Sequence, residues 1–262
     1  MRKKLRIILM LLCVVVFVFS GYQLVAELID ARRGQKATDL AQSLSGISQE
    51  ILTQEMQTTE QFEEVMDPNV QMLRKWDAAA LQEKNPDVVG WIYVPDTVIS
   101  YPILHAEDNN TYLRTSWTGE PSRAGSIILE ANNQSDFRDF HTILYGHHMR
   151  NGTMFADIVK YKDDVFQKDH PYVYVATANF VGRYQVFAAY ETPADSDVYC
   201  TSFADETQKQ QVLQSYLAQR KWAEDLEIST LDQILTLSTC TGDGGYENRW
   251  VVQAVLTDCW EI

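Results

Sequence analysis

The sequence predicts a mostly β protein, built as a closed eight-stranded barrel with helices before it and one helix inserted late in the chain. From residue 88 onward, eight short runs are rich in Val, Ile, Tyr and Phe, and Gly, Pro and Asn separate them. No regular pattern of helices alternates with these runs. Together, these observations favour an antiparallel-type barrel over a doubly wound parallel sheet.

A basic tip and an apolar segment open the chain, over residues 1–26. Arg2, Lys3, Lys4 and Arg6 precede residues 7–26, which carry no charge. A helix of about 20 residues rises about 30 Å, the thickness of the hydrocarbon core of a bilayer. We expect a retained single-pass anchor in the cell membrane, with a cytoplasmic N-terminus and an extracellular domain, because basic residues stay inside. A cleaved signal peptide is the alternative, and either interpretation exports the protein.

A polar stalk is expected between the apolar segment and the domain. Residues 27–68 are rich in Gln, Glu, Ser and Thr, and Leu and Ile recur among them at loose helical spacing. We therefore predict a helical or disordered segment that holds the domain, residues 69–262, away from the membrane.

Two helices are predicted around the strands. The first covers residues 70–83, where apolar side chains fall on one stripe, and the Asn-Pro pair at positions 85–86 ends it. The second covers residues 205–226, before the strand run TLSTC, because Val, Leu, Tyr and Ala recur there at helical period.

The net charge and the number of cysteines limit the classes of function that fit the sequence. The formal net charge is -14 at pH 7, and phosphate recognition needs a basic face, so the sequence argues against nucleic-acid binding. Cys13 lies in the apolar segment, which leaves Cys200, Cys240 and Cys259, an odd number that cannot all pair within one chain. A disulfide between Cys200 and Cys259 is one possibility, but we expect both to be buried as small apolar side chains.

Cys240 is the candidate nucleophile. It ends the strand run TLSTC, and the rim of a barrel places a side chain rigidly while leaving it accessible to substrate. A buried structural cysteine is the alternative, although such a residue would more naturally lie in the middle of a strand.

Two imidazoles follow another apolar strand, in LYGHH. An unperturbed thiol is mostly protonated near neutral pH, so a nucleophilic cysteine needs a base or a cation nearby, and His can be either. Adjacent residues of an extended chain face opposite ways. We choose His147, which directly follows Gly146, and expect His148 to face solvent or a loop. No spacing indicates a metal site. The other histidines are expected to be surface residues: His105, His141 and His170.

Arg249 opens the run RWVVQAVL, nine positions after Cys240. Strands joined by a short loop tend to be neighbours, which would place the guanidinium group beside the thiol. Such a group can stabilise the oxyanion of a tetrahedral intermediate. The alternative is a surface ion pair with Glu247 or Asp243, which would contribute only about 0–1 kcal/mol.

The chain resembles the sortase family in three features: the segment LYGHHMRNGTMFADIVKY, the strand run TLSTC and an Arg that opens the next strand. The resemblance extends over residues 85–256 through the segments NPDVVGWIYVP, DNNTYL and AGSIILE. The form GHHMRNGTMF, the N-terminal helices and the helix before TLSTC are most similar to class B. The resemblance implies a sortase-type β-barrel and a cysteine transpeptidase. It implies Cys240 as nucleophile, His147 as general acid and base, and Arg249 as an oxyanion or substrate clamp.

Sortases cleave a C-terminal sorting signal after Thr on a secreted protein, hold the acyl group as a thioester, and pass it to an amine. The resemblance thus implies three partners: a signal-bearing protein, a peptidoglycan precursor or pilin amine as acceptor, and the membrane. Neither a cofactor nor a metal ion is implied. Asn109, Leu113 and Ser238 are the expected substrate contacts. Turn formation, core packing and rim hydrogen bonding are their respective alternative roles.

Two other classes of function stay open. In a papain-like peptidase, which only hydrolyses, the catalytic Cys comes early in the chain and the His later, and the order here is the reverse. A transpeptidase that acts on peptidoglycan stems would carry a Ser-x-Gly-Cys segment, and this sequence has none. A membrane-anchored binding module would keep the barrel without needing Cys240. Three reactive groups at strand ends are difficult to explain by packing alone, which favours an enzyme.

Overall fold

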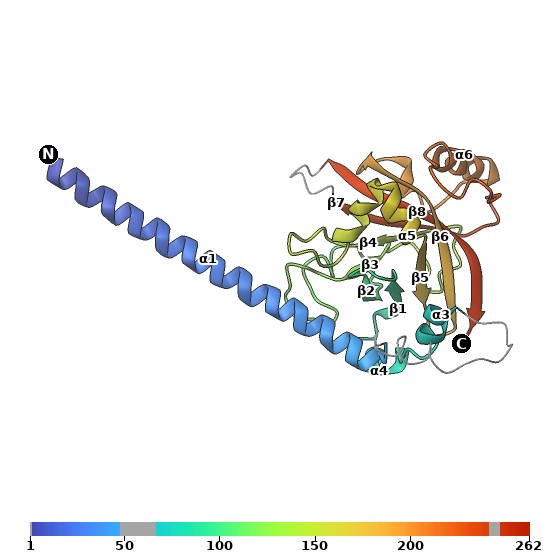
Figure 1. Ribbon diagram of the computed structural model, residues 1–262, viewed down its shortest axis with the longest axis horizontal. Helices are drawn as coiled ribbons and strands as arrows, with labels where there is room; N and C mark the ends of the chain where they lie inside the picture. Colours follow the sequence, from blue (N-terminus) through green and yellow to red (C-terminus); the bar gives the residue numbers. More distant parts are fainter. Residues whose placement is uncertain (1, 48–66, 241–246) are drawn as a thin grey trace.

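A closed barrel of eight strands forms the body of the computed structural model, which describes residues 2–47, 67–240 and 247–262 (Figure 1). Around the barrel the strand order is β1-β2-β3-β4-β7-β8-β6-β5. Each strand covers one of the predicted runs, so the predicted barrel is confirmed. The strands are β1 Val88–Tyr93, β2 Ser100–Leu104, β3 Ile127–Leu129, β4 His141–Tyr145, β5 Tyr172–Ala176, β6 Phe180–Pro193, β7 Ile234–Cys240 and β8 Asn248–Glu261.

The prediction of antiparallel pairing is wrong at two places in the barrel. β2 pairs with β3 in parallel, and β4 pairs with β7 in parallel, whereas the other neighbours are antiparallel. Parallel neighbours cannot be joined by a tight turn, and β5 and β6 lie in the connection between β4 and β7. Because β4 and β7 run the same way, their C-terminal ends reach the same rim.

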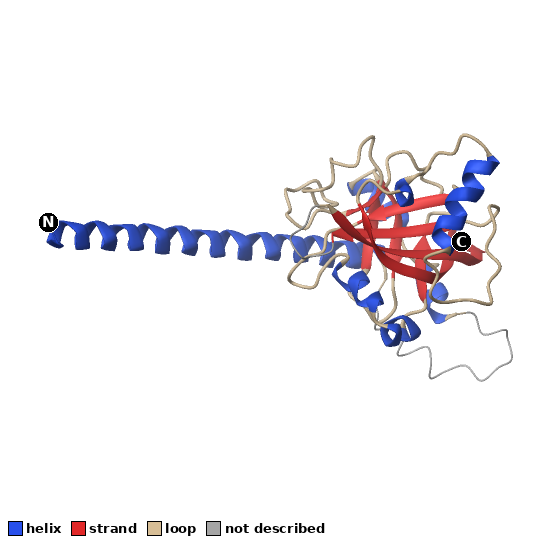
Figure 2. Cartoon of the chain, turned by 90° about the horizontal axis from the view of Figure 1, so that it is seen from above, coloured by secondary structure: helices blue, strands red, loops and turns tan. Residues whose placement is uncertain are grey.

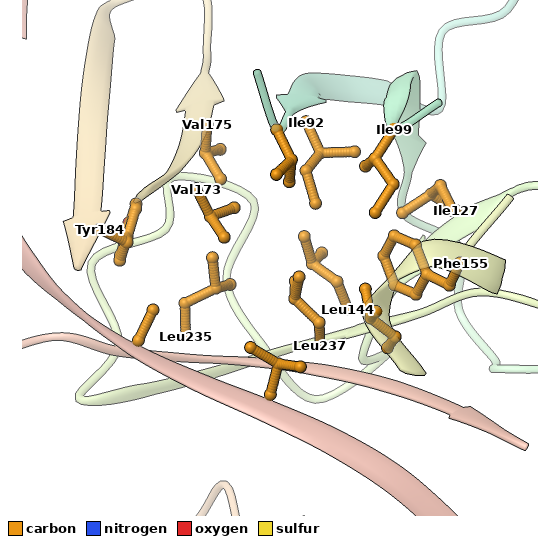
Figure 3. Close-up of a cluster of buried hydrophobic side chains, with 14 of the residues drawn as sticks. Ile92, Ile99, Ile127, Leu144, Phe155, Val173, Val175, Tyr184, Leu235 and Leu237 are labelled. Carbon is orange, nitrogen blue, oxygen red and sulfur yellow. The ribbon is translucent and has the colours of Figure 1, made fainter. Parts of the chain in front are cut away.

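Buried aliphatic and aromatic side chains fill the barrel. They alternate along the strands with residues that face outward, as a two-residue period requires. Figure 3 shows members of this cluster pointing toward one another from strands on opposite sides. Its labelled residues are Ile92, Ile99, Ile127, Leu144, Phe155, Val173, Val175, Tyr184, Leu235 and Leu237.

A long helix, α1 Arg2–Ser45, projects from the barrel, with its N-terminal part clear of the domain and its C-terminal end packed against it (Figures 1 and 2). Its part Met10–Ser45 is long and apolar enough to cross a membrane, with a mean hydropathy of 2.1 in its most apolar window, and a signal sequence meets the same criterion. The first part of the predicted stalk continues this helix without a break. Residues 48–66 of the predicted stalk lie outside the described residues.

The predicted single helix over residues 70–83 is wrong, because the chain forms two helices there: α3 Pro68–Leu73 and α4 Ala78–Lys84. The Asp77 carboxylate accepts a hydrogen bond of 2.9 Å from the backbone N–H of Ala80. This is an N-cap, and it starts a new helix within a segment whose apolar spacing suits a continuous one.

The helix predicted before TLSTC is confirmed but is shorter than expected, α6 Glu206–Leu217. Its N-cap is Asp205, whose carboxylate accepts a 2.8 Å hydrogen bond from the backbone N–H of Gln208. The remaining helices among the described residues are η1 Ala156–Lys162, α5 Asp164–Asp169 and η2 Asp197–Tyr199.

The expected burial of Cys200 and Cys259 is wrong. Cys259 is exposed, Cys200 is half-buried, and both are free thiols. Near the end of β8, half-buried and exposed residues alternate, and Cys259 is one of the exposed ones.

His141 is fully buried at the start of β4, which corrects the expectation of a surface residue. Its Nδ1 lies 2.9 Å from the backbone oxygen of Cys200, and its Nε2 lies 2.8 Å from Oγ1 of Thr236. A carbonyl oxygen only accepts, so Nδ1 carries the hydrogen and Nε2 accepts from the threonine hydroxyl. Burial lowers the pKa of His141 to about 4, although the bond to Cys200 and the charge of Asp139 raise it.

We expect His141 to make the folded domain less stable as the pH falls from 6.5 toward about 4. The pKa of this ring is lower in the folded than in the unfolded chain, so the unfolded chain takes up the proton first. The free energy of unfolding falls by roughly 3 kcal/mol by the lower end of this pH range. Unfolding by denaturant at several pH values would measure it, with His141→Gln as the comparison. An equally steep pH dependence in that variant would contradict the assignment.

Candidate active site

Cys240 and Arg249 lie directly opposite one another at one rim of the barrel. β7 ends at Cys240, and its antiparallel pairing with β8 aligns Arg249 with it. The Nη1 of Arg249 donates a 3.1 Å hydrogen bond to the backbone carbonyl of Asn248. Of the two acidic residues considered as ion-pair partners, Asp243 lies outside the described residues.

The parallel pair of β4 and β7 brings a third strand end to this rim. Tyr145 is aligned with Ser238, and His147 follows two residues later. Gly146 fixes the turn, because its N–H donates to the Ser238 carbonyl at 3.1 Å and its own carbonyl accepts from the Thr239 hydroxyl at 2.7 Å. The hydrogen bonds therefore continue beyond the end of β4 and hold the His147 backbone against β7.

Gly146 also has a packing role that no larger residue could fill. A Cβ atom at this position would lie 2.6 Å from the ring of Phe155 and 2.7 Å from the side chain of Ile127. Both neighbours belong to the buried cluster inside the barrel, so neither has room to move away. Only glycine therefore lets the backbone pass this close to Phe155 and Ile127 just before His147.

The imidazole of His147 is oriented by a backbone carbonyl. Its Nε2 lies 2.7 Å from the oxygen of Leu113, and since a carbonyl only accepts, Nε2 carries a hydrogen. In the neutral ring, Nδ1 is then the nitrogen able to take up a proton. Gly125, at φ +59°, lies against the same carbonyl, where a Cβ atom would come within 2.5 Å of the Leu113 oxygen.

A groove of about 350 Å³ runs along this rim, which we call the rim groove. All six residues singled out from the sequence line it, so the structure brings together the three reactive groups and the three expected substrate contacts. They are Asn109, Leu113, His147, Ser238, Cys240 and Arg249.

Two of the expected contacts already have partners within the protein. The amide of Asn109 donates to Glu130 at 2.7 Å, and its oxygen accepts from the backbone N–H of Ala131 at 2.8 Å. Ser238 is almost fully buried and its hydroxyl lies 2.9 Å from that of Tyr199. Their geometry favours a role in shaping the groove, whereas Leu113 is 38% exposed.

The sequence did not point to two tyrosines that also line the groove. The rings of Tyr145 and Tyr199 stack with centroids 6.2 Å apart. The Tyr145 hydroxyl donates to the buried carboxylate of Glu130 at 2.8 Å. Burial, and then the charge of Glu130, raises the pKa of Tyr145, which stays protonated and keeps donating. Tyr145 ends a strand and Tyr199 ends a short helix, and tyrosines in such places are too common for the sequence alone to have indicated a site.

Comparison with known proteins finds the sortase family across the barrel. The model of the sortase domain matches residues 92–257. Sortase B of Listeria monocytogenes serovar 1/2a is 36% identical over 242 residues, 92% of each chain, and that of Staphylococcus aureus is 29% identical, over 92% of this chain and 91% of the other. The matched region holds all three of the strand ends described above.

Solved structures agree with this comparison. Sortase B from B. anthracis in complex with AAEK1 has a TM-score of 0.69 and 32% identity, covering 88% of this chain and 99% of the other. A Staphylococcus aureus sortase B–substrate complex has a TM-score of 0.70 and 26% identity, with the same two coverages.

Proposed function

This chain belongs to the sortase family, class B, and we propose that it cleaves the sorting signal of a secreted protein at Cys240 and passes the acyl group to an amine. Sortases are cysteine transpeptidases, so the class of enzyme follows from the family. The observation that carries the finer proposal is that one groove is lined by a thiol, an imidazole and a guanidinium group, from three strand ends.

In the first half of the proposed reaction, the Cys240 sulfur attacks the carbonyl carbon of the signal's Thr. A carbon–sulfur bond forms, the peptide C–N bond breaks, and the leaving amine takes its proton from the imidazolium of His147. Arg249, aligned with Cys240 across the strand pair, stabilises the negative charge that develops on the carbonyl oxygen.

In the second half, an amine resolves the thioester. The amine nitrogen bonds to the carbonyl carbon, the C–S bond breaks, the sulfur leaves as a thiolate, and the surplus proton of the amine passes to His147. A thioester accepts an amine far more readily than an amide does, so the covalent intermediate suits an exchange of one amide for another. The acceptor is an amine of the cell wall or of a pilin.

The proposed domain layout follows the chain. Residues 1–26 are a cytoplasmic tip and a retained anchor, residues 27–68 are the stalk, and residues 69–262 are the extracellular catalytic domain. The charge-free segment and the basic residues before it support this orientation. Secreted substrates and a wall or pilin acceptor both require the catalytic groove on the outer side.

A library of signal peptides incubated with the full chain in detergent micelles tests the function. We expect at least one peptide to give a covalent adduct on Cys240, detected by mass spectrometry, and added hydroxylamine to convert it into a hydroxamate product. Release of free acid at the same rate with and without the amine would favour a hydrolytic peptidase. The absence of any adduct with every peptide would count against a transpeptidase of this kind.

A further inference from the structure

The buried carboxylate of Glu130 holds two residues of the rim groove without lining the groove itself. Glu130 directly follows β3 and is 6% exposed. One of its oxygens, Oε2, accepts from the Asn109 amide at 2.7 Å and from the Tyr145 hydroxyl at 2.8 Å. The other oxygen, Oε1, accepts from the backbone N–H and the side-chain amide of Asn132, at 3.2 and 2.8 Å. A single oxygen atom thus joins the segment after β2 to the end of β4.

A carboxylate in this buried position costs stability that its hydrogen bonds must offset. Glutamate is almost never fully buried unless it is paired, and removing a charged group from water is unfavourable. The groups that donate to Glu130 here are all neutral: two side-chain amides, a hydroxyl and a backbone N–H. The bonds made by Oε2 are also the ones that fix the wall of the rim groove.

The amide of Asn109 is fixed in one orientation. Its oxygen accepts from the backbone N–H of Ala131 at 2.8 Å, and an N–H can only donate. Its nitrogen donates to Glu130, and a carboxylate can only accept. Turning the amide over would face donor with donor and acceptor with acceptor. An amide nitrogen carries two hydrogens, and the one not used by Glu130 is available to a ligand in the groove that Asn109 lines.

The other group held by Glu130 extends this connection across the groove. The ring of Tyr145 stacks on that of Tyr199, with centroids 6.2 Å apart, and the Tyr199 hydroxyl lies 2.9 Å from that of Ser238. Ser238 belongs to β7, two residues before Cys240. Contacts between side chains therefore run from the segment after β2 to the strand that carries the thiol, and Glu130 is the charged member of this chain.

We propose that Glu130 is a positioning residue for the signal peptide and acts on it through Asn109 and Tyr145. The inference rests on the proposed function, because the groove must hold a peptide with one carbonyl carbon at Cys240. Asn109 then presents its second N–H to a backbone carbonyl of the peptide, and Tyr145 keeps its ring against Tyr199. Without the carboxylate both side chains are free to turn, so the peptide binds more weakly while the thiol keeps its reactivity.

Single-turnover adduct formation tests the proposal, because it separates peptide binding from thiol reactivity. The full chain in detergent micelles is mixed with increasing concentrations of one reactive signal peptide, and the adduct on Cys240 is followed by mass spectrometry. The rates give a half-saturating peptide concentration and a maximum rate. Alkylation of Cys240 by iodoacetamide, followed by peptide mapping, reports the reactivity of the thiol without a peptide.

We expect Glu130→Ala to raise the half-saturating concentration about tenfold, the effect of leaving buried donors without their acceptor. The maximum rate and the alkylation rate should stay close to those of the parent. Adding Asn109→Ala to Glu130→Ala should raise the concentration no further, because the two residues act through one contact. Glu130→Gln keeps an uncharged acceptor, so the rise should be only about threefold. Asn132→Ala is the matched control, an exposed donor to the other oxygen, and should bind the peptide like the parent.

An unchanged half-saturating concentration in Glu130→Ala would overturn the inference. So would an equal loss in alkylation by iodoacetamide, which would indicate general damage to the site, or effects of Glu130→Ala and Asn109→Ala that multiply to about 100-fold. Should Glu130→Ala not fold, Glu130→Gln replaces it, and the threefold rise must disappear when Asn109 is already alanine; no rise in Glu130→Gln, or the same rise in both backgrounds, would also overturn the inference. A parent protein that forms no adduct would instead overturn the proposed function.

Discussion

Cys240→Ala should abolish both adduct formation with signal peptides and transfer to any amine, a loss of at least about 1,000-fold. The reason is that alanine has no atom that can hold the acyl group, and a reaction split at a covalent intermediate cannot proceed without it. Mass spectrometry for the adduct and chromatography for the amide product would measure the two steps separately.

Two other cysteines provide matched controls for this substitution. Cys200→Ala and Cys259→Ala remove thiols that do not line the rim groove, and both variants should retain transfer close to the parent rate. Cys240 is half-buried at the end of a strand, so its replacement by alanine should leave the thermal unfolding midpoint nearly unchanged. Retained transfer in the Cys240 variant would eliminate the proposed chemistry and favour a binding module.

The strands could be predicted because each is specified locally. Runs of β-branched and aromatic residues between turn residues form strands whatever their partners, and all eight predicted runs do so. Pairing depends on contacts between distant segments, which no local pattern records. The parallel alignment of β4 with β7, which brings His147 to the rim, is a contact of this kind.

The candidate site shows the same division. Cys240, His147 and Arg249 could be singled out because a reactive side chain at a strand end is visible in the sequence, and their roles stay a prediction. The Leu113 carbonyl that orients His147 could not be predicted from the sequence, since any residue type can supply a carbonyl. The contribution of α1 to a groove beside Cys240 was equally hidden, because the polar composition of residues 27–45 indicated only a stalk.

The burial of His141 shows that residue type alone does not predict whether a side chain is buried. A histidine at a strand end is commonly exposed, but here a carbonyl and two hydroxyl groups surround the ring. Only the fold brings these partners together, because Cys200, Tyr216 and Thr236 are far from it in sequence. Buried polar groups that are fully hydrogen-bonded carry no sequence signature of their own.

His147→Gln should lower kcat/KM for transfer by about 100-fold to 10,000-fold, the range for loss of a general acid and base. The glutamine amide can still donate a hydrogen bond to the Leu113 carbonyl, which accepts from the imidazole in the parent at 2.7 Å. It has no nitrogen that takes up and releases a proton. The substitution therefore removes proton transfer by His147 but keeps its hydrogen bond to the Leu113 carbonyl.

The control for this change is His105→Gln, at a histidine that does not line the rim groove, and its transfer rate should match that of the parent. Added imidazole should partly restore transfer in His147→Ala, whose smaller side chain leaves space near Cys240. Full activity in His147→Gln would mean that the side chain at position 147 contributes only its hydrogen bond to the Leu113 carbonyl. The leaving amine would then have to take its proton from another donor or from water.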